Sequence, residues 1–382
     1  MESELSSRGL REINMGFIKS WIMSSSPPGA RRFINVTGFP FPLGPALERK
    51  TIRKELIPGS IWTFEQEQGL AGTTVSTNVR MTAVKTSRRS LWIHAPIAPT
   101  EECVQLLREL ELPVEAIVNP TYAYEHRVFV PSFSRRFPSA KVYSVRGWSF
   151  PLPLPDSLLG IDVEAYLDET ERLPWLDDFD CELLPVCFVG LAPYTEAAFF
   201  HRRTKTLITT DLFIKVSETP PEVIPEAKLE ALGSPDSVLA SLVRGSATSS
   251  PKNIPSNVLG WMRMTTLALF LGPSSLLDPR SAFGSISGRL TVSPVLRVLV
   301  FGKIRSSVQE WTEKIMNWPF DKIIPAHFDA PVRAGPDDMR NALTCVLQGR
   351  ADGVVEADLK NLRGINHVLR SLGIVNEEEE YV

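Results

Sequence analysis

The sequence predicts an α/β fold, and three observations support this prediction. Between residues 90 and 145, segments typical of strands alternate with segments typical of helices. Three strand-like apolar runs are followed by His126, Asp211 and His327, and polar residues at strand ends converge on one edge of a sheet in α/β proteins. The chain has 382 residues, 43% of them hydrophobic, and can bury one large core or two modest ones.

The first expected elements follow an irregular stretch. Prolines and glycines recur through residues 1–55 and prevent long regular elements, so we expect an irregular N-terminal extension there. Residues 60–64, 79–85 and 90–95 are rich in β-branched and aromatic residues, which predicts three successive short strands. Thr100 precedes two glutamates and a run of apolar residues at helical spacing, which predicts a capped helix.

The rest of the chain alternates between strands, helices and two surface excursions. Residues 146–180 and 216–256 are the expected excursions, and 246–256, rich in Ser, Pro and Asn, is the best candidate for a mobile loop. A turn between the apolar residues 197–201 and 206–210 predicts a hairpin. Further strands are expected at 114–118, 141–145, 182–188 and just before 327, and further helices at 132–137, 258–271, 306–317, 337–348 and 356–372.

The composition excludes several classes of protein. With 22% charged residues and a net charge of −3, the chain has no global field that attracts nucleic acid, so no nucleic-acid partner is expected. The 4 cysteines are widely spaced and form no CxxC pair, which argues against a disulfide scaffold or a structural zinc cluster. No apolar run reaches the roughly 20 residues of a membrane span, so no transmembrane segment is expected.

The candidate site consists of donors that follow strand-like runs. The chain has only 5 histidines, and His126 and His327 both stand at such positions. Together with Asp211 and Glu125 they offer two imidazoles and two carboxylates, a set that could hold one Zn²⁺, Fe²⁺ or Mn²⁺ ion. Glu125 is the candidate fourth ligand or general base. Three further residues are candidates for the edge of the same site: His94, Asn119 and Tyr122.

Each candidate also has a purely structural interpretation. Histidines beside strand ends are often simply hydrogen-bonded, Asp211 is suited to capping the loop after its strand, and Glu125 to solvent or an ion pair. His94 could bond to the proline-rich turn that follows it, and aromatic packing is the default role of Tyr122. Of the other histidines, His201 is expected at an exposed hairpin turn and His367 on a solvated helix.

The segment that ends at His126 resembles a known motif. The metallo-β-lactamase superfamily carries a His-x-His-x-Asp-His loop after a strand. Against it, Thr121 and Ala123 stand in place of the first two histidines, Glu125 in place of the aspartate, and His126 matches the last histidine. Asp211 resembles the metal-bridging aspartate of that superfamily. The resemblance implies that the first metal site is lost.

Two further positions extend this comparison. His327 resembles the final metal ligand of the superfamily. A third histidine would be expected near residues 190–195, where this chain has Pro193, Tyr194 and Thr195. Only the second metal site therefore keeps a donor at all four of its positions.

Four segments carry a narrower resemblance. They begin at Arg80, Leu91, Phe199 and Ile323, and their order is similar to that of an uncharacterised branch of the superfamily, domain of unknown function 4336, over residues 57–331. The resemblance implies a four-layer αββα sandwich with an irregular N-terminal arm and C-terminal helices. It implies no established activity.

The domain boundaries follow from where the proposed ligands stand. We expect an extension at 1–55 that is a candidate transit segment, one domain over 56–335, and C-terminal helices with an acidic tail over 336–382. The ligands come from both ends of the central span, so it cannot be two independent units.

The missing histidines favour a degenerate protein of this fold. Such a pseudoenzyme would serve as a binding module for a small molecule or a protein, with or without a metal. The alternative is a mononuclear metal-dependent hydrolase that uses His126, Asp211 and His327. Whether the chain is an enzyme is left open by the sequence.

The N-terminal charge gives an expectation for the compartment. Residues 1–54 carry nine Lys/Arg and four Asp/Glu, with several serines, as organelle transit segments do, although Glu2, Glu4 and Glu12 depart from that pattern. The similar branch occurs in cyanobacteria, algae and plants. We therefore expect an intracellular protein of the plastid, with the cytoplasm as the alternative.

Overall fold

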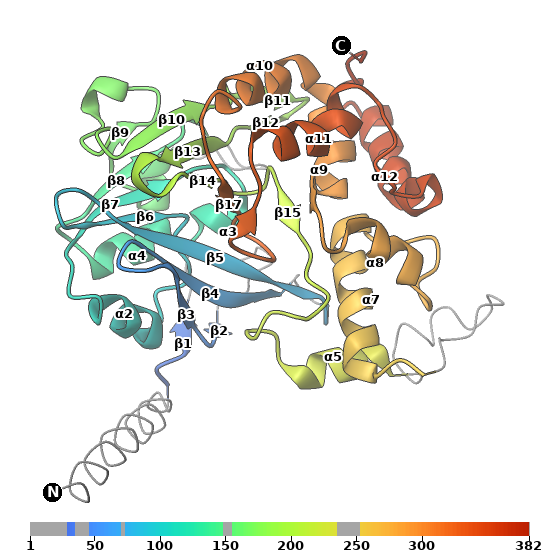
Figure 1. The fold of residues 1–382 in the computed structure, drawn as a ribbon, viewed down its shortest axis with the longest axis horizontal. Coiled ribbons are helices and arrows are strands. Elements are labelled where there is room, and N and C mark those ends of the chain that lie inside the picture. The colour runs from blue at the N-terminus through green and yellow to red at the C-terminus, as the bar shows by residue number, and fades with distance from the viewer. Residues whose placement is uncertain (1–28, 35–45, 70–72, 148–154, 235–252, 382) are drawn as a thin grey trace, which may run out of the picture.

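Two β-sheets form the centre of the molecule. The computed structural model describes residues 29–34, 46–69, 73–147, 155–234 and 253–381 (Figure 1). Within these ranges the larger sheet has seven strands, antiparallel from β3 to β6 and parallel from β6 to β9. Its strands, in spatial order, are β3 (Ile52–Ile57), β4 (Ile61–Gly69), β5 (Ser76–Lys85), β6 (Leu91–His94), β7 (Val114–Asn119), β8 (Lys141–Ser144) and β9 (Val163–Tyr166).

The second sheet is built around one parallel pair. Strands β14 and β17 run side by side in the same direction, with Ile208 opposite Ile324. In spatial order, its five described strands are β10 (Phe179–Leu183), β13 (Ala197–His201), β14 (Thr206–Ile208), β17 (Lys322–Ile324) and β18 (Val332–Arg333). Three small two-stranded pairs complete the described strands: β1 (Arg32–Ile34) with β2 (Ala46–Glu48), β11 (Cys187–Val189) with β12 (Ala192–Tyr194), and β15 (Ile214–Lys215) with β16 (Leu290–Thr291).

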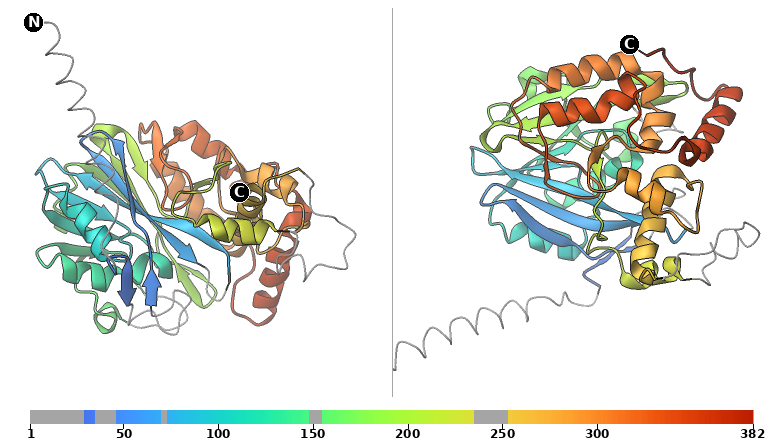
Figure 2. Two further views of the ribbon diagram at one scale, coloured as in Figure 1. Left: turned by 90° about the horizontal axis from the view of Figure 1, so that it is seen from below. Right: turned by 45° about the vertical axis from the view of Figure 1, so that its right-hand side comes forward.

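Helices cover the outer faces of both sheets, so the molecule has four layers (Figure 2). Helices α2 (Glu101–Arg108) and α4 (Val130–Arg136) pack on the first sheet, while α10 (Arg305–Ile315) and α11 (Pro336–Leu347) pack on the second. The other α-helices within the described ranges are α3 (Tyr124–Arg127), α5 (Glu226–Gly233), α7 (Ser256–Phe270), α8 (Arg280–Ile286), α9 (Pro294–Leu299) and α12 (Lys360–Ser371). Short 3₁₀ turns are η2 (Asp156–Leu159), η3 (Thr170–Arg172), η4 (Arg202–Thr204), η5 (Phe301–Lys303) and η6 (Glu356–Leu359). The predicted αββα arrangement is confirmed.

Alternation along the strands explains how the layers are separated. In β6, Trp92 points into the core between the two sheets, whereas its neighbours Leu91 and Ile93 point to the helices outside. The Trp92 ring lies 4.4 Å from that of Phe179 and 4.9 Å from that of Phe199, centroid to centroid. These aromatic contacts between strands of different sheets hold the two sheets face to face.

Several predicted elements differ from the structure. The strand expected at 182–188 is two strands, β10 and β11, because Pro185 between them has no N–H for a ladder hydrogen bond. The excursion expected at 146–180 contains β9, the edge strand of the first sheet, and the one expected at 216–256 contains α5. Most of the loop expected to be mobile, 246–252, lies outside the described residues, as do 1–28.

The expected boundary between residues 55 and 56 falls within a strand. Strand β3 begins at Ile52 and pairs with β4, so it runs across the position at which the N-terminal extension is expected to end. The division into 1–55, 56–335 and 336–382 stays a prediction. In the part of the chain that the structure describes, no helix has both the length and the apolar character needed to cross a bilayer.

His201 was expected in an exposed turn, and this expectation is wrong. It is the last residue of β13, its side chain is fully buried, and its ring lies 5.0 Å from that of Phe179. Its Nδ1 lies 2.7 Å from the Thr204 hydroxyl. The basic residues that follow it suggested exposure, but they point outward from the turn while β13 continues the core pattern of burial.

Burial of His201 predicts a loss of stability in acid. Burial, together with the positive charge of Arg203, lowers the pKa of His201 to about 4, against 6.5 in an unfolded chain. Below pH 6.5 the unfolded state binds the extra proton, so stability falls as the pH falls towards 4. Between pH 7.5 and pH 5, urea unfolding should show a loss about 2 kcal/mol larger for the wild type than for His201→Gln.

The control for this prediction is His367→Gln, because His367 is exposed on α12. This variant should keep the wild-type pH dependence. An unchanged profile in His201→Gln would contradict the account.

Candidate metal centre

The polar residues of the site come from the ends of strands in both sheets. Because β14 and β17 are parallel neighbours, Asp211 and His327 stand at equivalent points, each three residues beyond its strand. His126 arrives from the first sheet, in the short helix α3 that follows β7. An isolated bridge between Thr121 and Glu196 joins the loop before α3 to the second sheet. The topology thus brings together residues that are far apart in sequence.

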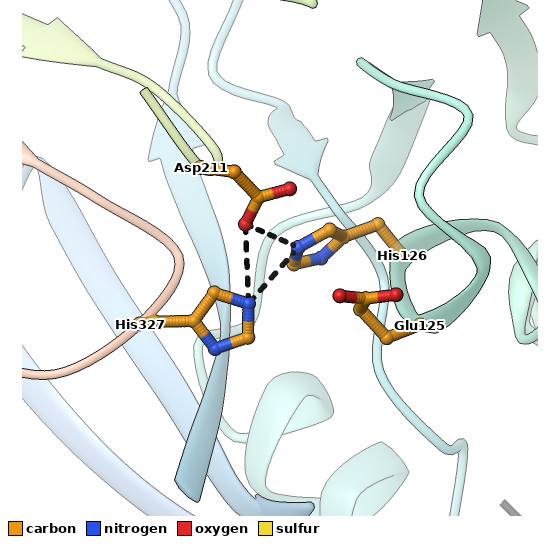
Figure 3. A group of neighbouring side chains, drawn as sticks. All are labelled: Glu125, His126, Asp211 and His327. Atoms are coloured by element: carbon orange, nitrogen blue, oxygen red, sulfur yellow. Dashed lines mark hydrogen bonds and ion pairs between the residues drawn. The ribbon is translucent and has the colours of Figure 1, made fainter. Parts of the chain in front are cut away.

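Three donor atoms form a nearly equilateral triangle (Figure 3). The Nε2 atoms of His126 and His327 are 3.2 Å apart, and Asp211 Oδ1 lies 3.4 Å from the first and 3.3 Å from the second. Glu125 offers a carboxylate oxygen to the same group, and all four donor atoms lie within 4.8 Å of one another. The His126 side chain is fully buried, whereas those of Asp211 and His327 keep 15% and 13% exposure.

The triangle has the dimensions of a metal coordination shell. Two ligands of a tetrahedral zinc ion, each about 2.0–2.1 Å from the metal, lie roughly 3.3–3.4 Å from each other. The three separations match this edge length. Four N/O donors of this kind therefore fit Zn²⁺, Fe²⁺ or Mn²⁺, whose preferred ligands they are.

Asn78, in β5, fixes the ring of His327. Its main-chain carbonyl accepts a hydrogen bond from His327 Nδ1 at 2.8 Å, so the ring carries a proton on Nδ1 and directs Nε2 into the triangle. The Asn78 amide also clamps the next residue, accepting from Phe328 N at 2.7 Å and donating to Phe328 O at 3.0 Å. Phe328 has φ of +57°, a conformation that costs free energy, and this clamp offsets that cost.

A buried arginine also holds the loop that carries His327. Arg80, two residues further along β5, is 1% exposed and pairs with Glu65 at 2.7 Å. Its guanidinium also donates to the carbonyls of Pro325 and Phe328. Arg80 thus holds the loop on both sides of His327.

Glu196 holds the main chain of the loop that carries Asp211. One oxygen of this fully buried carboxylate accepts from the main-chain N–H groups of Thr210 at 2.8 Å, Asp211 at 3.1 Å and Leu212 at 3.3 Å. The other accepts from the Tyr194 hydroxyl at 3.0 Å. Burial and the charge of Asp211 raise the pKa of Glu196 to about 7, although the bond from Thr210 opposes the rise.

The groups of the triangle shift one another's pKa values. Burial lowers the pKa of His126, but the adjacent Asp211 carboxylate outweighs burial and raises that pKa above its usual value. Burial likewise raises the pKa of Asp211, but the two imidazoles outweigh it and hold that pKa well below its usual range. Asp211 is therefore a carboxylate at neutral pH, as a metal ligand must be.

The three residues expected at the edge of the site differ in position. His94 is buried at the end of β6, stacks on Trp92 at 5.8 Å, and has a pKa lowered to about 3, first by burial and then by the charge of His126. Its Nε2 has no hydrogen-bond partner among the described residues. Asn119 donates from Nδ2 to the Ser144 hydroxyl at 2.9 Å, at the ends of β7 and β8. Tyr122 lines the pocket described next.

A pocket of about 470 Å³ opens beside the triangle. Its lining includes Glu125, Asp211 and His327 together with the side chains of α9 and the end of α7. The volume lies in the range of small-molecule sites. A ligand in this pocket would reach the donor atoms directly.

Of the residues at which the resemblance expects first-site histidines, Ala123 offers no donor, and two threonines, Thr121 and Thr195, make hydrogen bonds within the protein. Thr121 donates from its hydroxyl to the Thr195 carbonyl at 2.9 Å, and the Thr195 hydroxyl donates to the Leu184 carbonyl at 2.5 Å. Both residues are fully buried. These hydroxyls therefore serve as structural bonds between the loops.

Sequence reasoning missed Asn78, Arg80 and Glu196 as parts of the site. The sequence nevertheless contains a feature that marks each of these residues. Asn78 and Arg80 are polar residues on one face of a strand, where such residues are depleted, and Glu196 is the charged residue before an uncharged strand run. A buried polar residue of this kind must find a partner, and here the partners are the loops that carry the donors.

Comparison with known proteins identifies the family. The sequence pattern described as Domain of unknown function (DUF4336) matches residues 58–281 and 277–345, more than half of the chain. The chain belongs to the DUF4336 family. The resemblance of the four sequence segments is thereby confirmed. No curated protein matches this DUF4336 chain.

Solved structures give more distant similarities. A metallo-β-lactamase from Pontibacter korlensis is 11% identical, with 77% of this chain and 99% of that chain covered and a TM-score of 0.37. A flavoprotein from Thermotoga maritima is 11% identical, with 77% and 60% covered and a TM-score of 0.43. The metal-soaked Flv1 flavodiiron core from Synechocystis is 10% identical, with 78% and 61% covered and a TM-score of 0.40.

Proposed function

We propose that this DUF4336 protein binds one divalent transition metal through His126, Asp211, His327 and Glu125 and is a metal-dependent hydrolase. The observation that supports the proposal most strongly is the donor triangle, whose three separations of 3.2–3.4 Å match the edges of a coordination tetrahedron. Two nitrogen lone pairs and one carboxylate so arranged would repel one another without a cation or shared proton. The pocket beside them gives a substrate access.

Different residues would have different roles in the proposed hydrolysis. A bound metal supplies Lewis acidity, which lowers the pKa of water and polarises a carbonyl or ester oxygen. Asn78 orients His327 through Nδ1, and Glu196 orients the loop of Asp211. Glu125 lines the pocket and is suited to serve as fourth ligand or as the base that takes a proton from water.

A binding module without catalysis is the second candidate. The observation in its favour is that Thr121, in place of the first motif histidine, and Thr195, in the segment where a third histidine is expected, both donate their hydroxyls to main-chain carbonyls. Loss of two-metal activation lowers the rate expected of any hydrolase here. Under this interpretation the pocket holds a small molecule or a segment of a partner protein.

Elemental analysis of protein purified without a histidine tag tests the proposal. The protein should carry about one equivalent of Zn, Fe or Mn, and chelation should lower its melting temperature, because a ligand that binds only the folded state stabilises it. The metal-loaded form should hydrolyse p-nitrophenyl esters, and the chelated form should not.

Two outcomes would decide against the proposal. A metal content near zero, with no thermal shift on adding any of the three ions, would contradict the metal site. One equivalent of metal without turnover would favour the binding module.

The plastid, with the cytoplasm as the alternative, stays a prediction for the compartment.

A further inference from the structure

We infer that the pocket selects neutral substrates with an apolar chain and disfavours anionic ones such as phosphodiesters. This inference rests on the proposed hydrolase function and adds a substrate class to it. In the reaction, water adds to the carbonyl carbon of an ester and the bond to the leaving oxygen breaks. The products are a carboxylate, an alcohol and one proton.

Part of the pocket wall is apolar. Leu269 at the end of α7, Val295 and Leu296 in α9, and Val300 after it all line the pocket. Of these, Val295, Leu296 and Val300 are only half-buried, so their side chains offer surface to a ligand. An acyl chain that covers such surface gains roughly fourfold in affinity for each buried methylene.

The charges that line the pocket are negative. Among its described lining residues there is no lysine or arginine, while Glu125 and Asp211 are both acidic. A divalent metal bound by these two carboxylates would offset their charge, so an anionic group in the pocket would meet no net positive charge and none of the lysine or arginine side chains that recognise phosphates elsewhere.

Cations near the pocket are already paired. The Arg127 guanidinium lies 5.3 Å from the ring centre of Tyr122, a residue that lines the pocket, but it is buried and bonded to Asp156. Arg80 lines a separate, smaller pocket below the His327 loop and is paired with Glu65. Neither charge is free to bind an anionic substrate.

Binding of two probes with the same chain length tests the inference independently of turnover. Octanamide is neutral, and octyl sulfate carries the single negative charge of a phosphodiester. In calorimetric titrations of the full-length protein, octanamide should bind at least tenfold more tightly than octyl sulfate. Equal or tighter binding of octyl sulfate, or no binding of octanamide, would overturn the inference.

Matched variants assign the selectivity to this pocket. Leu296→Lys should lower the ratio of the octyl sulfate dissociation constant to the octanamide dissociation constant at least tenfold. Leu296→Glu should raise this ratio. Val368→Lys, on the exposed face of α12, should leave the ratio unchanged. If Leu296→Lys and Val368→Lys behave alike, the selectivity does not come from this wall. Failure of ester turnover with the expected binding would refute the hydrolase and leave the pocket selectivity standing.

Discussion

His126→Ala and His327→Ala should each reduce the bound metal from about one equivalent to less than about a tenth. Both imidazoles point Nε2 into the donor triangle, 3.2 Å apart. Removing either leaves one imidazole and two carboxylates, a set that suits Zn²⁺ poorly. Elemental analysis after dialysis against a weak chelator measures the loss, and melting curves with and without added metal measure it a second time.

The control for these two variants is His367→Ala, because His367 is exposed on α12 and distant from the triangle in sequence. It should keep the full metal content. His201 is not a suitable control, since it is buried in the core. Retention of metal by His126→Ala, with loss only in His327→Ala, would remove His126 from the ligand set.

Arg80→Met should lower the free energy of unfolding by about 3–5 kcal/mol. The variant leaves the Glu65 carboxylate, 5% exposed, without its ion pair, and the carbonyls of Pro325 and Phe328 without the donors they have now. Such an uncompensated buried charge is among the most costly defects in a protein core. Urea unfolding measures the change, and metal content should fall as well because the His327 loop loses its support.

A matched arginine shows whether burial is the cause. Arg88 pairs with Glu115 at 2.9 Å, but its side chain is 45% exposed, so Arg88→Met should cost no more than about 1 kcal/mol. Adding Glu65→Gln to Arg80→Met should recover part of the loss, since it removes the unpaired charge. Equal costs for the two arginine variants would contradict the role assigned to Arg80.

The sequence predicted the donors better than their supports. His126, Asp211 and His327 follow apolar runs, and the parallel pairing of β14 with β17 brings the last two together as expected for strand ends. Asn78 could not be assigned in the same way, because its partner His327 is 249 residues away and no local pattern records that contact. Glu196 was missed although its partners, the N–H groups of residues 210–212, are near in sequence, because the contact forms only when the hairpin brings them together.

The misassigned elements have a related cause. Strand β9 carries little hydrophobic pattern of its own and forms because β8 offers it an edge. His201 was placed in solvent because its sequence neighbours are basic, whereas the sheet places its side chain in the core. In both cases tertiary packing overrides the local composition.

The donor triangle joins the two sheets, and this has a consequence for how long the protein survives. His126 and His327 are 201 residues apart in sequence, so we expect their contact to form late in folding, when the two sheets dock. An interaction that forms only after the folding transition state slows unfolding without speeding folding. A metal bound there is expected to lower the unfolding rate, which would prolong the lifetime of the native state against proteases.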